Sequence, residues 1–191
     1  MAGPPPGGKT ELRRWYRQRR ADLLSAAQAD LLAAAGRQLP PLLPPGQWLG
    51  IYWPLPGEAD LTPLAERPDL AGRLALPRVS QGQLRYRPWQ PGEPLSLDDT
   101  GIPAPASTDD LQAEQLGLLL APALACDRQG IRLGYGGGWF DRLRSTPEWR
   151  SIPALVVLPS GCLQPRLPRD PWDVPFDGWL HERGLHWLRA V

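Results

Sequence analysis

The chain has 191 residues, a formal net charge of +1 and 42% hydrophobic residues, so one substantial core is expected and bulk charge does not favour a nucleic-acid partner. Glycine and proline number 20 and 25, just short of the share at which disorder becomes the first expectation. Cys126 and Cys162 give neither a disulfide framework nor a metal-ligand spacing, and we find no secretory signal or bilayer-spanning run, so we expect a cytoplasmic protein with reduced thiols.

The N-terminal region predicts two helices after a flexible start. Residues 1–8 are rich in proline and glycine and are expected to be flexible. A basic helix begins at Lys9, and its buried stripe recurs at helical spacing: Leu12, Trp15, Tyr16, Leu23 and Leu24. A second helix is expected over residues 26–39, before two prolines. The mixture of cations and aromatics leaves an RNA-binding interpretation open, although a solvated basic face is favoured for most of the helix.

The remainder of the chain alternates strands, turns and helical segments. Up to residue 110 we expect a strand at 48–53, a loop at 54–60, a short helix at 61–66, a strand at 73–77, a hairpin turning at Gln81-Gly82 and an extended surface loop at 90–110. Beyond it we expect a strand at 116–122, a turn at 127–130, a helix at 139–144, a strand at 152–158, a loop at 167–177 and a short strand at 179–180. This alternation predicts one α/β domain over residues 1–191, built on a mainly parallel sheet.

The most informative segment is the glycine-rich run Arg-Leu-Gly-Tyr-Gly-Gly-Gly-Trp-Phe-Asp-Arg at residues 132–142. It lies between the predicted strand at 116–122 and a predicted helix, at the edge where open α/β sheets place ligands. Its backbone amides can form an anion cradle, Arg132 adds a fixed cation, and Asp141 adds an oxygen ligand suited to Mg²⁺. The pattern matches neither a P-loop nor a dinucleotide fingerprint, and a flexible surface loop is the competing interpretation.

Lys9 is the only lysine beside twenty arginines, and asparagine is absent. We interpret this bias as pressure from a GC-rich genome, under which a retained lysine can indicate a need for a compact ammonium at a phosphate. An accidental survivor near the terminus is an equally good explanation from composition alone. Lys9 and Arg13 are four residues apart on a helix and therefore share a face, where they can project into one phosphate site.

Weaker candidates are scattered along the chain. Glu58 and Asp60 follow a strand, yet acidic loop residues are mostly just solvated. Asp173, between two apolar neighbours, can be a metal ligand or a hydrogen-bonded turn residue. Cys126 has no nearby base to make it a nucleophile. Structural roles are favoured for His181 and His186, which have no surrounding motif.

Taken together, these segments resemble the 5-formyltetrahydrofolate cyclo-ligase (methenyltetrahydrofolate synthetase) family over nearly the whole chain. The strongest match is the run at 132–141, which follows a family-like segment at 121–127. The Lys9-x-x-Leu-Arg13 pattern, the segment 52–60 and the segment 167–173 also match, in the family's order.

The resemblance implies a three-layer α/β/α, Rossmann-like sandwich and an ATP- and Mg²⁺-dependent enzyme that converts 5-formyltetrahydrofolate to 5,10-methenyltetrahydrofolate, releasing ADP and phosphate. It implies catalytic roles for Lys9 and Arg132, and Mg²⁺ ligation by Asp141 and Asp173. The folate pocket would involve Trp53, Glu58 and Phe140. The implied ATP-binding residues are Lys9, Arg13, Arg132, Leu133, Gly134, Tyr135, Gly136, Gly137, Gly138, Trp139 and Phe140. The partners would be reduced folate and ATP, without nucleic acid or membrane, and a monomer is expected.

The chain departs from the family pattern in several places. Trp139 and Phe140 replace a common pair of tyrosines, and Trp172 stands where a histidine is frequent. Ala104 replaces the usual glutamate before Pro105, and the segment 158–162 lacks a familiar glutamine. Two other interpretations remain open: an enzyme of the same broad fold acting on a sugar phosphate or coenzyme A, and a non-catalytic nucleotide- or RNA-binding relative.

Overall fold

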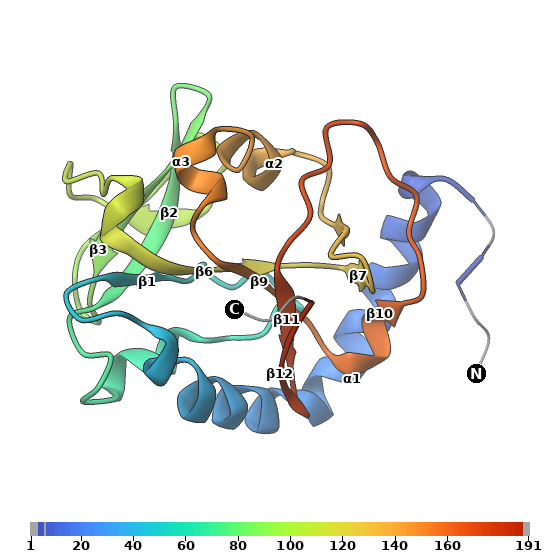
Figure 1. Cartoon of the computed structure of the whole chain (residues 1–191), viewed down its shortest axis with the longest axis horizontal. Helices are drawn as coiled ribbons and strands as arrows, with labels where there is room; N and C mark the ends of the chain where they lie inside the picture. The colour runs from blue at the N-terminus through green and yellow to red at the C-terminus, as the bar shows by residue number, and fades with distance from the viewer. Residues whose placement is uncertain (1–3, 6, 189–191) are drawn as a thin grey trace.

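The computed structural model describes residues 4–5 and 7–188 (Figure 1). The flexible start expected at residues 1–8 therefore falls in part on residues 1–3 and 6, which lie outside the described residues. Within the described part of the chain, no helix has the length and apolar character needed to cross a membrane.

A seven-stranded sheet forms the centre, in the order β12-β11-β9-β6-β1-β2-β3. Its strands are β1 (Trp48–Gly50), β2 (Leu74–Ser80), β3 (Gln83–Trp89), β6 (Leu116–Pro122), β9 (Ala154–Val157), β11 (Gly178–His181) and β12 (Gly184–Trp187). The strands from β11 to β2 in this order are parallel, while β3 and β12 are antiparallel to their neighbours. The prediction of a mainly parallel sheet is confirmed, as is the hairpin at Gln81-Gly82.

Smaller strands lie outside this sheet. A second sheet contains β7 (Ala125–Asp127), β8 (Arg132–Leu133) and β10 (Leu163–Gln164). The segment 90–110, predicted as an extended loop, contains a two-stranded hairpin of β4 (Leu95–Leu97) and β5 (Pro103–Pro105), so that prediction was incomplete. The hairpin is held at its turn by Asp98, whose carboxylate accepts hydrogen bonds from the backbone of Val79, Thr100 and Ile102.

The helices are α1 (Lys9–Gln38), α2 (Trp139–Leu143) and α3 (Pro147–Arg150), with short 3-10 turns η1 (Pro40–Leu42), η2 (Thr62–Glu66), η3 (Ala113–Gln115) and η4 (Ser160–Cys162). The prediction of two N-terminal helices was wrong, because α1 is continuous. Residues 21–30 contain neither glycine nor proline and are rich in alanine and leucine, so nothing interrupts the helical hydrogen bonds there. In Figure 1, α1 runs along one side of the sheet, and α2 and α3 lie on the other.

The core has two halves, one on each face of the sheet, because the central strands are buried on both faces. On β6, Leu118 and Leu120 belong to the half that contains the later turns of α1, whereas Leu119 and Ala121 belong to the half that contains α2. The first turns of α1 contribute Leu12 and Tyr16 to the α2 half. The beginning of α1 therefore extends past the sheet toward the glycine-rich loop.

Candidate active site

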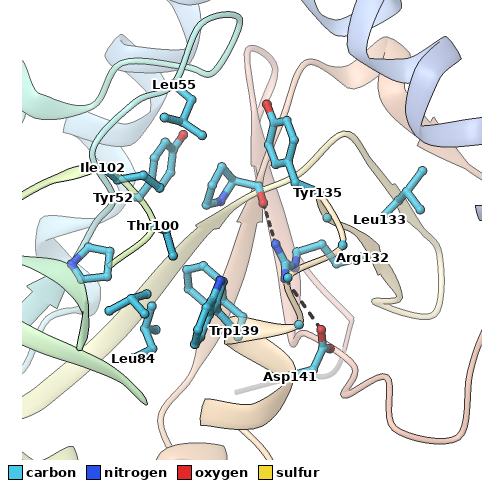
Figure 2. Close-up of a pocket in the computed structure, with 18 of the residues that line it drawn as sticks. Tyr52, Leu55, Leu84, Thr100, Ile102, Arg132, Leu133, Tyr135, Trp139 and Asp141 are labelled. Atoms are coloured by element: carbon cyan, nitrogen blue, oxygen red, sulfur yellow. Dashed lines mark hydrogen bonds and ion pairs between the residues drawn. The ribbon is translucent and has the colours of Figure 1, made fainter. Parts of the chain in front are cut away.

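A cavity of about 280 Å³ opens beyond the carboxyl ends of β1 and β6. Every residue predicted for a site role lines it: Lys9, Arg13, Trp53, Glu58, Arg132, Leu133, Gly134, Tyr135, Gly136, Gly137, Gly138, Trp139, Phe140, Asp141 and Asp173. Figure 2 shows Tyr52, Leu55, Leu84, Thr100 and Ile102 on one side and Arg132, Leu133 and Tyr135 on the other. The cavity thus has an apolar half and a cationic half.

The glycine-rich loop forms the wall of the cationic half. Gly136 and Gly138 have φ of 109° and 64°, in the left-handed region that favours glycine. A side chain on Gly136 would also meet the Arg13 guanidinium at 3.6 Å. Arg13 Nε in turn donates to the Gly134 carbonyl at 3.0 Å. The loop and the first turns of α1 are therefore joined directly.

Arg132 is the central cation of this half. Its guanidinium donates to the Pro122 carbonyl at the end of β6 (3.0 Å), and Nη2 lies 3.9 Å from Asp141 Oδ2 (Figure 2). It also lies over the rings of Phe140 and Phe176, at 4.9 and 5.5 Å from their centroids. Burial lowers the pKa of Arg132, and Asp141 opposes that shift. These contacts with a carbonyl, a carboxylate and two aromatic rings hold the positive charge of Arg132 at the cavity wall.

Lys9 is held by two carboxylates. Its Nζ lies 2.7 Å from Asp170 Oδ2 and 2.5 Å from Asp173 Oδ2. Burial alone would lower the pKa of Lys9, but the hydrogen bonds to Asp170 and Asp173 outweigh it and raise the pKa. The ammonium is therefore charged and fixed at the cavity mouth, 161 residues away in sequence from its first partner.

The two aspartates predicted to bind Mg²⁺ face the same cavity. Asp141 Oδ1 accepts the backbone N–H of Val174 at 3.3 Å, which connects it to the residue that follows Asp173. Among the described residues there is no cluster of three or more acidic, histidine or cysteine ligands. The two carboxylates, Asp141 and Asp173, nevertheless suit Mg²⁺, because this ion commonly binds one or two carboxylates together with phosphate oxygens and water.

Glu58 is a buried acidic side chain in the wall of the apolar half. Only 6% of the residue is exposed, its Oε2 accepts the Leu55 N–H at 2.9 Å, and its Oε1 is buried without a hydrogen bond. Burial raises the pKa of Glu58, against the Leu55 N–H and the Arg20 guanidinium. Oε1 has an ion-pair contact with Arg20 but no hydrogen bond, so an acceptor in the cavity wall is left for a polar ligand. Asp60, its neighbour in the loop, instead holds the next turn by accepting from Thr62.

Sequence reasoning missed three residues at this site: Arg20, Tyr52 and Asp170. Arg20 was grouped with the solvated basic face of its helix, yet its side chain is 2% exposed and lies 3.5 Å from Glu58 Oε1. The signal was present in the spacing, because Arg20 is four residues after buried Tyr16 and three before Leu23. Tyr52 lines the cavity and donates to the Ala59 carbonyl at 2.9 Å, which braces the loop that carries Glu58.

The weaker candidates have structural positions. Cys126 is fully buried on β7, and burial raises the pKa of its thiol to about 12, so it is not a nucleophile. The ring of His186 stacks on Trp179 at 4.5 Å. Two residues that depart from the family pattern also line the cavity: Phe140, which is buried, and Trp172, which is 69% exposed.

Proteins with similar sequences include two bacterial enzymes. The 5-formyltetrahydrofolate cyclo-ligase of Escherichia coli (strain K12) is 31% identical over 170 residues, covering 83% of this chain and 92% of that protein. The Mycolicibacterium smegmatis protein of the same name is 28% identical and covers 96% of this chain and 99% of its own length.

Solved structures show the same fold. An NMR structure of 5,10-methenyltetrahydrofolate synthetase from Aquifex aeolicus superposes with a TM-score of 0.74 at 29% identity, over 96% of this chain and 94% of that one. The Mycoplasma pneumoniae synthetase, at 20% identity, has a TM-score of 0.67 over 91% and 98%. The model of the 5-formyltetrahydrofolate cyclo-ligase family matches residues 8–182, and the chain belongs to that family.

Proposed function

We propose that this protein converts 5-formyltetrahydrofolate to 5,10-methenyltetrahydrofolate, with ATP consumed and ADP and phosphate released. The observation that carries the proposal is one cavity with two unlike halves. The half built by the glycine-rich loop, Lys9, Arg13 and Arg132 suits phosphates, while the half around Trp53 and Glu58 suits a flat ring with polar edges.

The chemistry needs both halves at once. The formyl oxygen of the substrate is a poor leaving group until it takes the γ-phosphoryl group of ATP. N10 of the folate then attacks the formyl carbon, the ring closes, and the oxygen departs with phosphate. Such a reaction depends on positioning and charge neutralisation more than on a protein nucleophile, which agrees with the buried, unreactive thiol of Cys126.

In this proposal Lys9, Arg13, Arg132 and the amides of residues 133–140 hold the ATP phosphates. Asp141 and Asp173 hold Mg²⁺, which supplies charge neutralisation at the phosphates when bound. Trp53, Glu58 and Phe140 contact the folate, with Glu58 accepting hydrogen bonds from N–H groups of the pterin ring.

The proposal also includes a monomer that works in the cytoplasm on small molecules alone. Large exposed hydrophobic side chains within the described ranges are few and lie apart in the sequence: Leu42, Leu97, Tyr135 and Trp172. This distribution gives little support for an obligate interface. Two buried free thiols, Cys126 and Cys162, suit a reducing compartment.

The direct test is to mix the protein with 5-formyltetrahydrofolate and MgATP and follow the ultraviolet absorbance of the methenyl product. Product should form only with all three present, and ADP should be released in equal amount. Absence of ATP-dependent product at high protein concentration would rule the proposal out. It would then favour a nucleotide-binding relative without this activity, which equilibrium binding of ATP alone would detect.

Replacing Asp141 with asparagine is expected to raise the Mg²⁺ concentration needed for half-maximal rate by about tenfold or more, because a carboxylate ligand becomes a neutral amide. The amide retains an oxygen that can accept the Val174 N–H, so the local fold should persist. The measurement is a magnesium titration at fixed ATP. Asp109→Asn, an exposed acidic residue outside the cavity, serves as the control. An Asp141→Asn titration that overlays the wild-type curve would remove Asp141 from the metal site.

A further inference from the structure

Arg20 connects three parts of the site through one buried guanidinium. It projects from α1, and its Nη1 donates to the Ala123 carbonyl at 3.1 Å, just after β6. The same Nη1 lies 3.5 Å from Glu58 Oε1, and Nη2 donates to the Tyr135 hydroxyl of the glycine-rich loop. The side chains of Arg20 and Glu58 are each 2% exposed. Arginine side chains are rarely buried to this degree unless their charge is paired, as it is here with Glu58.

Arg20 contributes to the electrostatic state of Glu58, where it favours the ionised carboxylate together with the Leu55 N–H. The groups that face this carboxylate are Arg20 from α1, Tyr135 and Arg132 from the glycine-rich loop and β8, and Tyr52 from the end of β1. Of these, Arg20 is the cation that forms an ion pair with Glu58, with 3.5 Å between Nη1 and Oε1. A buried carboxylate without such a partner takes up a proton. Once protonated, the carboxyl group has an O–H that donates and fewer positions that accept. It therefore matches the N–H groups of the pterin ring less well.

Tyr135 connects Arg20 to the phosphate half of the cavity. Its ring lies under the guanidinium of Arg20, 5.3 Å from Cζ to the centroid, and its hydroxyl accepts from Nη2. Tyr135 stands in the glycine-rich loop, between Gly134 and Gly136. One side chain of α1 therefore fixes both the acceptor of the folate half and a residue of the phosphate half.

We propose that Arg20 is a positioning residue for the folate half, which keeps Glu58 ionised and aimed into the cavity and anchors Tyr135 against it. The inference rests on the proposed function, because it takes Glu58 to be the partner of the pterin. Arg20 acts through Glu58, and its contacts lie with the protein. Its loss therefore affects folate binding most, while the glycine-rich loop keeps its separate contact with α1 through the hydrogen bond from Arg13 to the Gly134 carbonyl, so that ATP binding changes less.

The test is the steady-state kinetics of Arg20→Met. The folate KM is expected to rise by about tenfold or more, the effect of weakening charge-assisted hydrogen bonds, while the ATP KM changes by less than about threefold. Arg20→Lys, which keeps a charge without the planar fork, should recover part of the folate affinity. Arg17→Met is the matched control, because exposed Arg17 lies over the same Tyr135 ring, at 5.6 Å, and its folate KM should stay near wild type.

Two further readouts separate positioning from general damage. Without Arg20 the pKa of Glu58 rises, so the ratio of mutant to wild-type folate KM should fall as pH increases from about 6 to about 9. Arg20→Met combined with Glu58→Gln should raise the folate KM by clearly less than the product of the two single effects, since Arg20 acts mainly through that carboxylate. Additive effects, or a KM ratio constant across pH, would contradict the inference.

Arg20→Met can also weaken folding, because the guanidinium binds the Ala123 carbonyl. Tyr135→Phe covers that case, since Tyr135 is 38% exposed and the change removes only the hydroxyl that Arg20 contacts. A smaller rise in folate KM at unchanged thermal stability is expected, and an unchanged folate KM would contradict the anchoring of Tyr135. The wild-type turnover is measured first. Failure there overturns the proposed function, whereas an active wild type with an unchanged folate KM in Arg20→Met overturns only the role of Arg20.

Discussion

Replacing Lys9 with alanine should lower kcat by about 100- to 1,000-fold and leave the fold intact, the usual cost of removing one preorganised charge from a phosphoryl-transfer site. Lys9 is the first residue of α1, and its polar contacts in the structure are with Asp170 and Asp173. Its removal therefore takes a fixed cation from the cavity without opening the core. The measurement is the initial rate at saturating folate and MgATP, together with thermal unfolding.

The comparison variants for Lys9 follow from its surroundings. Arg14→Ala removes an exposed cation from the same helix and should leave the rate near that of wild type. Lys9→Arg retains the charge in a larger planar group and should restore only part of the rate, because the pocket between Asp170 and Asp173 fits a compact ammonium. A Lys9→Ala enzyme with wild-type kinetics would show that the single lysine is an accident of composition.

Arg132→Gln is expected to reduce kcat/KM for ATP by about 1,000-fold, comparable to the loss of a catalytic arginine in phosphoryl transfer. Arg132 supplies a buried permanent charge between the end of β6 and Asp141, and glutamine can keep only a hydrogen bond to the Pro122 carbonyl. The charge neutralisation is lost while the donor to the backbone remains possible. Initial rates across an ATP titration give the value.

Stability must be measured beside activity for Arg132, since its guanidinium packs on Phe140 and Phe176. Arg132→Lys keeps a cation in the same place but lacks the planar stacking group, and it should retain more activity than Arg132→Gln. Arg128→Gln, at an exposed arginine on the preceding turn, is the control for charge in general. Equal activity in Arg132→Gln and Arg128→Gln would exclude Arg132 from catalysis.

Much of this fold could be predicted because its signals are local. The apolar run at 116–122 forms β6, which is buried over its first six residues, and Gly136 and Gly138 of the loop have the positive φ that glycine adopts most easily. The two-helix prediction for the N-terminal region failed because exposed Ser25 and its neighbours form helix as readily as turn when no glycine or proline intervenes. Strand β12 was missed because its four residues, Gly184–Trp187, show neither clear alternation nor length.

Site residues that belong to a sequence motif could be predicted. Site residues whose role depends on tertiary contacts could not. Lys9, Arg132 and Asp141 were found from segments that resemble one family. Arg20 was not: its spacing from Tyr16 and Leu23 places it on the buried stripe, but only the tertiary contacts with Glu58 and Tyr135 show why a charged side chain is buried there. Asp170 was likewise hidden, because its contact with Lys9 joins opposite ends of the chain.

The two buried free thiols can be used to detect local opening of the structure. Cys126 lies on β7 and Cys162 lies in η4, which packs against α1, and both are 0% exposed. A thiol reagent can reach Cys162 when α1 separates from η4, and it can reach either thiol when the whole chain unfolds. The rate at which Cys162 is labelled under native conditions, compared with that of Cys126, therefore reports how often the helix that carries Lys9, Arg13 and Arg20 separates from η4, independently of catalysis.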